Sequence, residues 1–101
     1  MPDSHVDTVK QALFEAGAGC YQHYEHCAWQ TLGQGQFKPL ADSHPFIGQI
    51  DKLETVLEYK VEMICDARCL NAALSALRQA HPYQQPAYGV FPLQFGHEEA
   101  T

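Results

Sequence analysis

The chain has 101 residues, of which 46% are hydrophobic and 18% are charged, and twelve acidic against six basic side chains give a formal net charge of −6. This length accommodates one domain with one core, and this composition excludes a disordered chain. Because a negative protein repels the phosphates of DNA and RNA, we expect no nucleic-acid partner.

The N-terminus has no basic start followed by an apolar run, and no apolar stretch approaches the about 20 residues that a membrane span needs. We therefore expect a cytoplasmic protein without a membrane partner. In a reducing compartment its four cysteines are expected to be free thiols. They are Cys20, Cys27, Cys65 and Cys69.

The first third of the chain predicts a helix and a hairpin. Ser4 and Asp7 resemble a capping box, and apolar residues then recur at helical spacing until Gly17, which predicts a helix over 4–17. Residues 27–32 alternate like a strand. The permissive sequence 33–35, Gly-Gln-Gly, then predicts the tight reversal of a β-hairpin into 36–38.

The middle of the chain predicts a loop followed by a strand. Residues 39–52 show neither helical nor strand periodicity and are interpreted as a loop. Its apolar pair, Phe46 and Ile47, is the first place where we expect subunit contacts. Residues 53–65 alternate between apolar and polar side chains. This pattern predicts a long strand with one face in solvent.

The last third predicts a helix and a closing strand. Asp66 can cap a helix whose apolar stripe ends at His81 and Pro82, because proline cannot continue a helix. Residues 88–93 predict a short strand, and the tail 96–101 is expected to be frayed. The order of elements predicts one α+β domain over 1–95, with two helices on one face of an antiparallel sheet.

Five short segments carry a resemblance to a known family. They are 9–19, 27–29, 33–40, 45–48 and 81–88. Together, and in this order, they resemble the YqfO group of the Nif-three (Ngg-interacting factor) proteins. The resemblance implies a ferredoxin-like fold close to the CutA and PII trimers, and therefore a homo-oligomer, with a trimer favoured. In that family a similar domain is inserted into a larger dinuclear-metal protein or stands alone, and this chain resembles the stand-alone form.

Two departures from the family pattern matter for function and fold. The family usually has two glutamates where this chain has Gln84 and Gln85, which weakens a metal role for the turn. The family also has an apolar strand before the first helix, and Met1 stands where that strand ends. The hypothesis is that the start is misassigned or truncated, or that a partner chain donates a strand.

The turn 81–88 is the first candidate site. His81 follows the second helix, whose dipole favours a cation there, and the glutamines can hydrogen-bond a polar ligand. The predicted ligand-binding residues are His81, Tyr83, Gln84, Gln85 and Tyr88. The alternative is a rigid helix stop whose tyrosines fill a subunit interface.

The segment 20–27 is the second candidate site, because it gathers thiols, imidazoles and a carboxylate that can ligate zinc or copper. The predicted metal ligands are His23, His26 and Cys27, with His81. If the segment is extended, these side chains point to different faces, so a solvated strand entry with Cys27 as an apolar filler is the alternative. A site shared between subunits is a further possibility. Cys69, near a helix start, is interpreted as structural.

Three functions fit the sequence. The first is a non-catalytic, oligomeric regulatory or binding domain that holds a metal ion or a small ligand near His81. The second is a metal-assisted hydrolase, by analogy with the long family members, although the sequence has none of the common catalytic motifs and we expect no enzyme. The third is a protein-interaction domain without a ligand.

Overall fold

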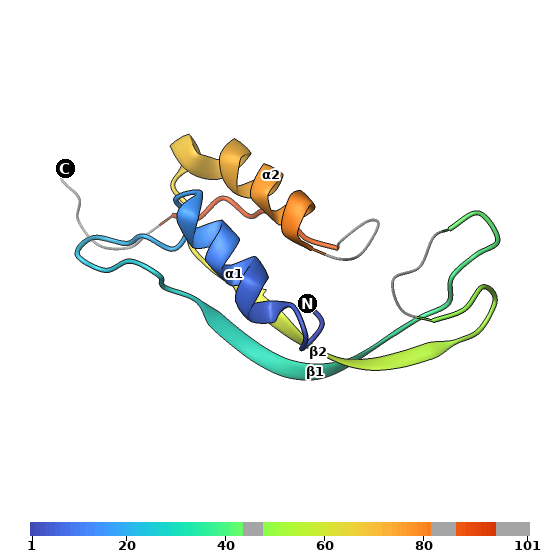
Figure 1. Cartoon of the computed structure of the whole chain (residues 1–101). Helices are drawn as coiled ribbons and strands as arrows, with labels where there is room; N and C mark the ends of the chain where they lie inside the picture. The colour runs from blue at the N-terminus through green and yellow to red at the C-terminus, as the bar shows by residue number, and fades with distance from the viewer. Residues whose placement is uncertain (44–47, 82–86, 95–101) are drawn as a thin grey trace.

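A computed structural model describes residues 1–43, 48–81 and 87–94 of the chain. Two helices, α1 (Val6–Glu15) and α2 (Leu70–Ala80), lie on the same face of a ribbon formed by strands β1 (Trp29–Phe37) and β2 (Glu54–Glu62), as Figure 1 shows. A short 3-10 turn, η1 (Ala67–Cys69), leads into α2. The arrangement is α+β and matches part of a ferredoxin-like fold, as predicted.

Helix α1 forms because its apolar residues fall on one side. Val6, Val9 and Leu13 are buried, and the helix ends in a Schellman motif in which Gly17 N–H donates to Phe14 O and Ala18 N–H donates to Leu13 O. The predicted capping box is wrong. His5 takes the N-cap position without a side-chain cap bond, and Ser4 Oγ instead lies 2.8 Å from His5 Nδ1.

Helix α2 begins and ends where the sequence predicts. The Asp66 side chain accepts a hydrogen bond from Arg68 N–H at 2.9 Å and so caps η1. The helix ends at Ala80, where His81 N–H donates to Leu77 O. Ala73 and Leu77 of this helix pack with Val9, Leu13 and Ala18 to form the core.

The predicted hairpin at 33–35 is wrong, because Gly33 and Gly35 lie inside one continuous strand. β1 pairs with β2 in antiparallel register, with Gly33 opposite Glu58 and Gly35 opposite Val56. A side chain at Gly35 would overlap the Glu58 carboxylate. Glycine here therefore allows a close approach within the sheet, not a turn.

The predicted alternation of buried apolar and exposed polar side chains along β2 is confirmed in the half of the strand that the helices cover. Lys10 Nζ of α1 donates to Gln30 Oε1 at 2.7 Å, which assigns Gln30 and its partner Val61 to the helix face. Val61 is half-buried while Lys60 and Glu62 are exposed. Leu57 faces the same way but is 64% exposed, because the ribbon extends past the helices (Figure 1).

The predicted closing strand is wrong in the part of 88–93 that the structure describes. The whole segment 87–94 has no strand assignment and is exposed. A strand needs a hydrogen-bonded neighbour. The fold expected from the sequence has another strand between this segment and β2. Among the described residues only Met1 and Pro2 lie at that position, and Pro2 forms an antiparallel bridge with Glu58 of β2.

Several predictions fall outside the described residues. They concern Phe46 and Ile47, the turn residues 82–86, and the tail from 95 onward. The domain limits 1–95 stay a prediction. None of the described helices has the length and apolar character that crossing a bilayer requires.

Candidate functional site

His81 is a half-buried histidine at the end of α2, and charges from the N-terminal segment and from β2 act on its pKa. Burial lowers its pKa most, followed by the positive charge of the Met1 amino group, while Glu58 acts to raise it and His5 to lower it. The pKa therefore moves below the ordinary value of 6.5, opposite to the effect of the helix dipole alone. The neutral imidazole is favoured, which is the form that ligates metals.

The neighbours of His81 were missed by the sequence reasoning. The Met1 amino group donates to Tyr59 O at 2.7 Å and lies 3.6 Å from Glu58 Oε2. No spacing in the sequence links Glu58 to His81, because Glu58 belongs to β2 and His81 follows α2. The one sequence signal was indirect: the family pattern places the N-terminus beside β2.

The structure describes two of the five predicted ligand-binding residues. Tyr88 is 47% exposed, and its hydroxyl accepts a hydrogen bond from Arg78 Nη1 of α2 at 3.2 Å. Tyr83, Gln84 and Gln85 lie outside the described residues. A ligand site at this turn therefore stays a prediction.

The segment 20–27 is not extended, contrary to one of the two arrangements considered from sequence. Tyr21 and Tyr24 exchange two backbone hydrogen bonds of 2.9 Å each, which closes a tight turn with Gln22 at φ 53°. His23 lies at the exposed tip of this turn. The turn removes the strand alternation on which the separation of these side chains was argued.

His26 and Cys27 lie at the end of α1. The His26 ring stacks on Phe14, with 4.5 Å between ring centroids and an interplanar angle of 8°, and Cys27 N–H donates to Gly19 O at 2.8 Å. The pKa of His81, in contrast, is lowered by the charge of His5, which lies at the start of α1. The length of a ten-residue helix, about 15 Å, separates the two ends. Within one chain, His81 and His26 cannot bind the same ion.

The predicted metal ligands therefore lie in two separate places, the segment 20–27 and His81 after α2. Among residues 1–43, 48–81 and 87–94, no three His, Cys, Asp or Glu side chains gather in a group that could hold a metal ion. A metal site that includes both His26 and His81 needs two chains.

All four cysteines are free thiols in the structure. Burial raises the pKa of Cys65, and the nearby Cys69, Asp66 and Cys20 raise it further. A β-carbon at Gly17 would lie 2.7 Å from Cys69 Sγ, so this thiol fills the space beside the end of α1. These contacts favour the structural interpretation of Cys69.

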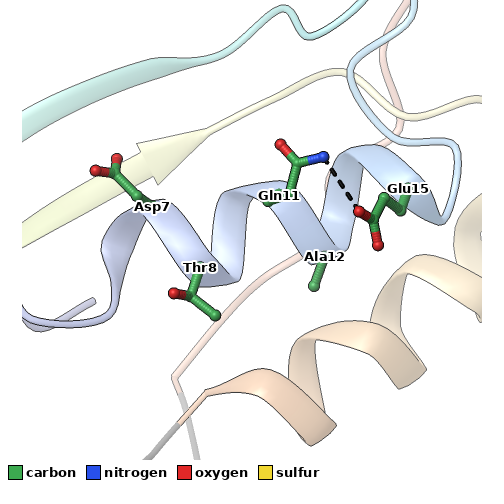
Figure 2. A pocket seen from close by; sticks show the side chains of 5 residues that line it. All are labelled: Asp7, Thr8, Gln11, Ala12 and Glu15. Carbon is green, nitrogen blue, oxygen red and sulfur yellow. Dashed lines mark hydrogen bonds between the residues drawn. The ribbon is translucent and has the colours of Figure 1, made fainter.

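An open hollow runs along one side of α1, away from the predicted sites. Figure 2 shows that its lining side chains all come from this helix and that Gln11 and Glu15 point toward each other. Gln11 Nε2 donates to Glu15 Oε2 at 3.2 Å. The lining residues are Asp7, Thr8, Gln11, Ala12 and Glu15. Two carboxylates on one exposed helix face are typical of a solvated surface.

Similar proteins are found by sequence and by structure. A GTP cyclohydrolase 1 type 2 homolog of Mycobacterium leprae is 45% identical over 92% of this chain and 24% of its own length. The homolog of Bacillus subtilis is 37% identical over 93% of this chain and 25% of its own length. The chain thus spans about a quarter of these relatives.

A crystal structure of a Bacillus cereus protein related to NIF3 superposes with a TM-score of 0.79 at 35% identity, covering 94% of this chain and 24% of that protein. No protein-family model matches the chain. The sequence and structural matches nevertheless agree with each other and with the motifs. They confirm the resemblance: over most of its length the chain is similar to about a quarter of the longer, YqfO-like proteins of the NIF3 family.

Proposed function

We propose that this domain is a non-catalytic, homo-oligomeric binding module. The observation that carries the proposal is the ribbon arm, defined as residues 32–37 and 54–58, which extends past α1 (Figure 1). On its helix-side face Leu32 and Leu57 are 53% and 64% exposed. They are diagonal neighbours across the two strands, close enough to form one apolar patch.

The shape of the molecule supports the same proposal. Its extents are 54 × 23 × 21 Å, and its radius of gyration is 15.7 Å. A compact domain of this length has a radius of gyration of about 13 Å. A protruding arm with an apolar face is expected to pack against a second copy, and the family resemblance favours three copies.

The ligand in this proposal is a metal ion such as zinc or copper, or a small polar molecule. His81 favours the neutral imidazole that a metal needs, and His23, His26 and Cys27 lie at the other end of the helix pair. In an oligomer, His81 of one copy can meet the segment 20–27 of the next. This arrangement would place the ligand at a subunit boundary.

Solution mass tests the oligomer. Light scattering of the wild-type chain is expected to give a multiple of the monomer mass, and Leu57→Asp is expected to give the monomer because it buries a charge in the interface. Thr31→Asp is the matched control, since it introduces the same charge at an exposed position on the opposite sheet face. A monomeric wild-type protein would refute the proposal.

Ligand binding is tested separately. Zinc or copper is expected to raise the melting temperature of the wild-type oligomer and to do so less for His81→Gln, because binding to the folded state stabilises it. The relatives are named for GTP cyclohydrolase, so the same samples are incubated with GTP. Turnover of GTP would contradict the non-catalytic part of the proposal.

A further inference from the structure

Two thiols lie at the two ends of the short turn η1 that leads into α2. Cys65 comes just before the turn, and Cys69 is its last residue. Both residues bond to one acceptor: Cys65 Sγ donates to Asp66 O at 3.4 Å, and Cys69 N–H donates to the same oxygen at 2.9 Å. Because one carbonyl oxygen accepts both bonds, the Cys65 sulfur lies beside the backbone of Cys69.

The carboxylate of Asp66 is engaged elsewhere. Its Oδ1 accepts hydrogen bonds from Arg68 N–H at 2.9 Å and from Arg68 Nε at 3.1 Å. The two side chains are 49% and 87% exposed. The ion pair therefore lies on the solvent side of η1 and does not separate the two thiols.

Both thiols face the turn that follows α1. A β-carbon at Gly17 would lie 2.7 Å from Cys69 Sγ, so this sulfur fills the space beside that residue. Cys65 is partly buried and packs against the core cluster. Gly19 N–H donates to Ile64 O at 2.7 Å, which fixes the residue before Cys65 to the same turn. The end of α1 thus holds both thiols next to η1.

The charge of Cys69 acts on Cys65. Burial is the largest cause of the raised pKa of Cys65, and the charge of Cys69 comes second, ahead of Asp66 and Cys20. Asp66 is the adjacent residue, so the larger effect of Cys69 agrees with two sulfurs that lie close together. Cys20 is exposed and has the smallest effect of the three.

We propose that Cys65 and Cys69 form a redox switch, in which a low-molecular-weight disulfide such as glutathione disulfide oxidises the two thiols to one intramolecular disulfide. The Cys69 thiolate attacks one sulfur of glutathione disulfide, breaks its S–S bond and releases one glutathione. The Cys65 thiolate then attacks the Cys69 sulfur of the mixed disulfide and releases the second glutathione. The two protons of the protein thiols end on the two glutathiones, so the chain loses two hydrogen atoms and glutathione disulfide is reduced.

The disulfide changes the contact between α1 and the start of α2. It holds the two sulfurs about 2 Å apart, so Cys69 Sγ leaves its place beside Gly17. The packing of Cys69 described above is that of the reduced protein. Dithiols that oxidise transiently in a reducing compartment are typical of redox sensing. The ribbon arm takes no part, so the switch does not depend on the oligomer proposed above.

Peptide mapping of the intact chain tests the pairing. The folded protein is incubated with glutathione disulfide, its remaining thiols are alkylated, and it is then digested with trypsin without a reductant. Trypsin cleaves after Arg68, so Cys65 and Cys69 fall on separate peptides, 61–68 and 69–78. We expect mass spectrometry to find these two peptides joined in most of the chains, and to find them separate after treatment with dithiothreitol.

The same digest distinguishes the other pairings. Cys20 and Cys27 lie together on the peptide 11–52, because Pro39 prevents cleavage after Lys38. A link between this peptide and either of the other two would overturn the proposal. So would glutathione that stays on the chain as a mixed disulfide while the two expected peptides remain unlinked.

Two variants and one structural measurement complete the test. Cys69→Ser is expected to abolish the link, whereas Cys20→Ser, the matched control at a neighbouring thiol, is expected to form it to the same extent as the wild type. The amide resonance of Gly17 is expected to shift on oxidation, while that of Gly33 in β1 stays in place. A link that forms without a shift at Gly17 would show that oxidation does not reach α1 and would overturn the switch.

Discussion

At Gly17 the backbone turns from α1 toward the sheet with φ at +107°, and Cys69 of the 3-10 turn closes over it. A side chain here would have both an unfavourable backbone angle and a contact with Cys69 Sγ at 2.7 Å. We expect Gly17→Ala to lower the free energy of unfolding by about 1–3 kcal/mol, as measured by urea denaturation.

Gly33→Ala is the matched control for Gly17→Ala. A β-carbon at Gly33 meets no atom within 4 Å, and alanine has lower backbone entropy in the unfolded chain. We expect this variant to be as stable as the wild type or slightly more stable. Equal destabilisation by both substitutions would show that the left-handed backbone at Gly17 is not the cause.

The lowered pKa of His81 makes stability depend on pH with a defined sign. Burial disfavours the imidazolium in the folded state, so below the ordinary pKa of 6.5 the unfolded chain binds more protons than the folded one. The contribution of this histidine is therefore fully present above that pKa and is lost as the pH falls. We expect the urea midpoint of the wild type to fall between about pH 7.5 and about pH 5 more steeply than that of His81→Gln.

His23→Gln is the control for this measurement, because His23 lies on an exposed turn. Its urea midpoint is expected to follow the wild type across the same range. If His81→Gln also follows the wild type, the lowered pKa of His81 has no effect on folding.

Among the elements, the contact between α1 and α2 supplies most of the core. Leu77 is 7% exposed and packs with Val9 and Leu13 across the two helices. Removing this side chain leaves a cavity between two helices, each of which buries the apolar residues of only one side. We expect Leu77→Ala to cost about 2–5 kcal/mol of unfolding free energy.

Gln79→Ala is the control for Leu77→Ala, since Gln79 is an exposed residue of the same helix with similar helix propensity. Its midpoint in urea is expected to lie within experimental error of the wild type. A loss as large as that of Leu77→Ala would show that packing in the core is not the cause of the destabilisation.

The helices could be predicted from sequence because their signals are local. The apolar stripe, Gly17 and Asp66 act within a few residues, and the structure confirms α1 and α2 close to the predicted bounds. The predicted hairpin failed because glycines in an alternating pattern fit either a turn or a continuous strand, and only the pairing of β1 with β2 decides between them. The closing strand failed because a ladder depends on a neighbour distant in sequence.

The candidate sites were predictable only as residue types. The sequence identifies His81 as the end of a helix and 20–27 as rich in ligands, both of which are local facts. It does not show that the charges of Met1 and Glu58 act on the pKa of His81, or that Tyr21 and Tyr24 close a turn at His23. Distances between segments arise from packing, which periodicity does not encode.

The whole molecule combines a small core with a long, uncovered arm. Among the described residues, the buried hydrophobic side chains come only from α1, α2 and the turn after α1. They are Val6, Val9, Leu13, Ala18, Ala73 and Leu77. A core of this size gives limited stability to a single chain. Association through the ribbon arm would then contribute to the folded state itself.

This coupling predicts a melting temperature that depends on protein concentration. Folding linked to association is favoured by mass action, so we expect the wild-type melting temperature to rise by several degrees over a hundredfold increase in concentration. Leu57→Asp, which places a charge on the arm, is expected to melt at a lower temperature with no such dependence. Differential scanning calorimetry of both chains measures this. A wild-type melting temperature that is independent of concentration would show that the single chain holds its own fold and that the arm adds nothing to it.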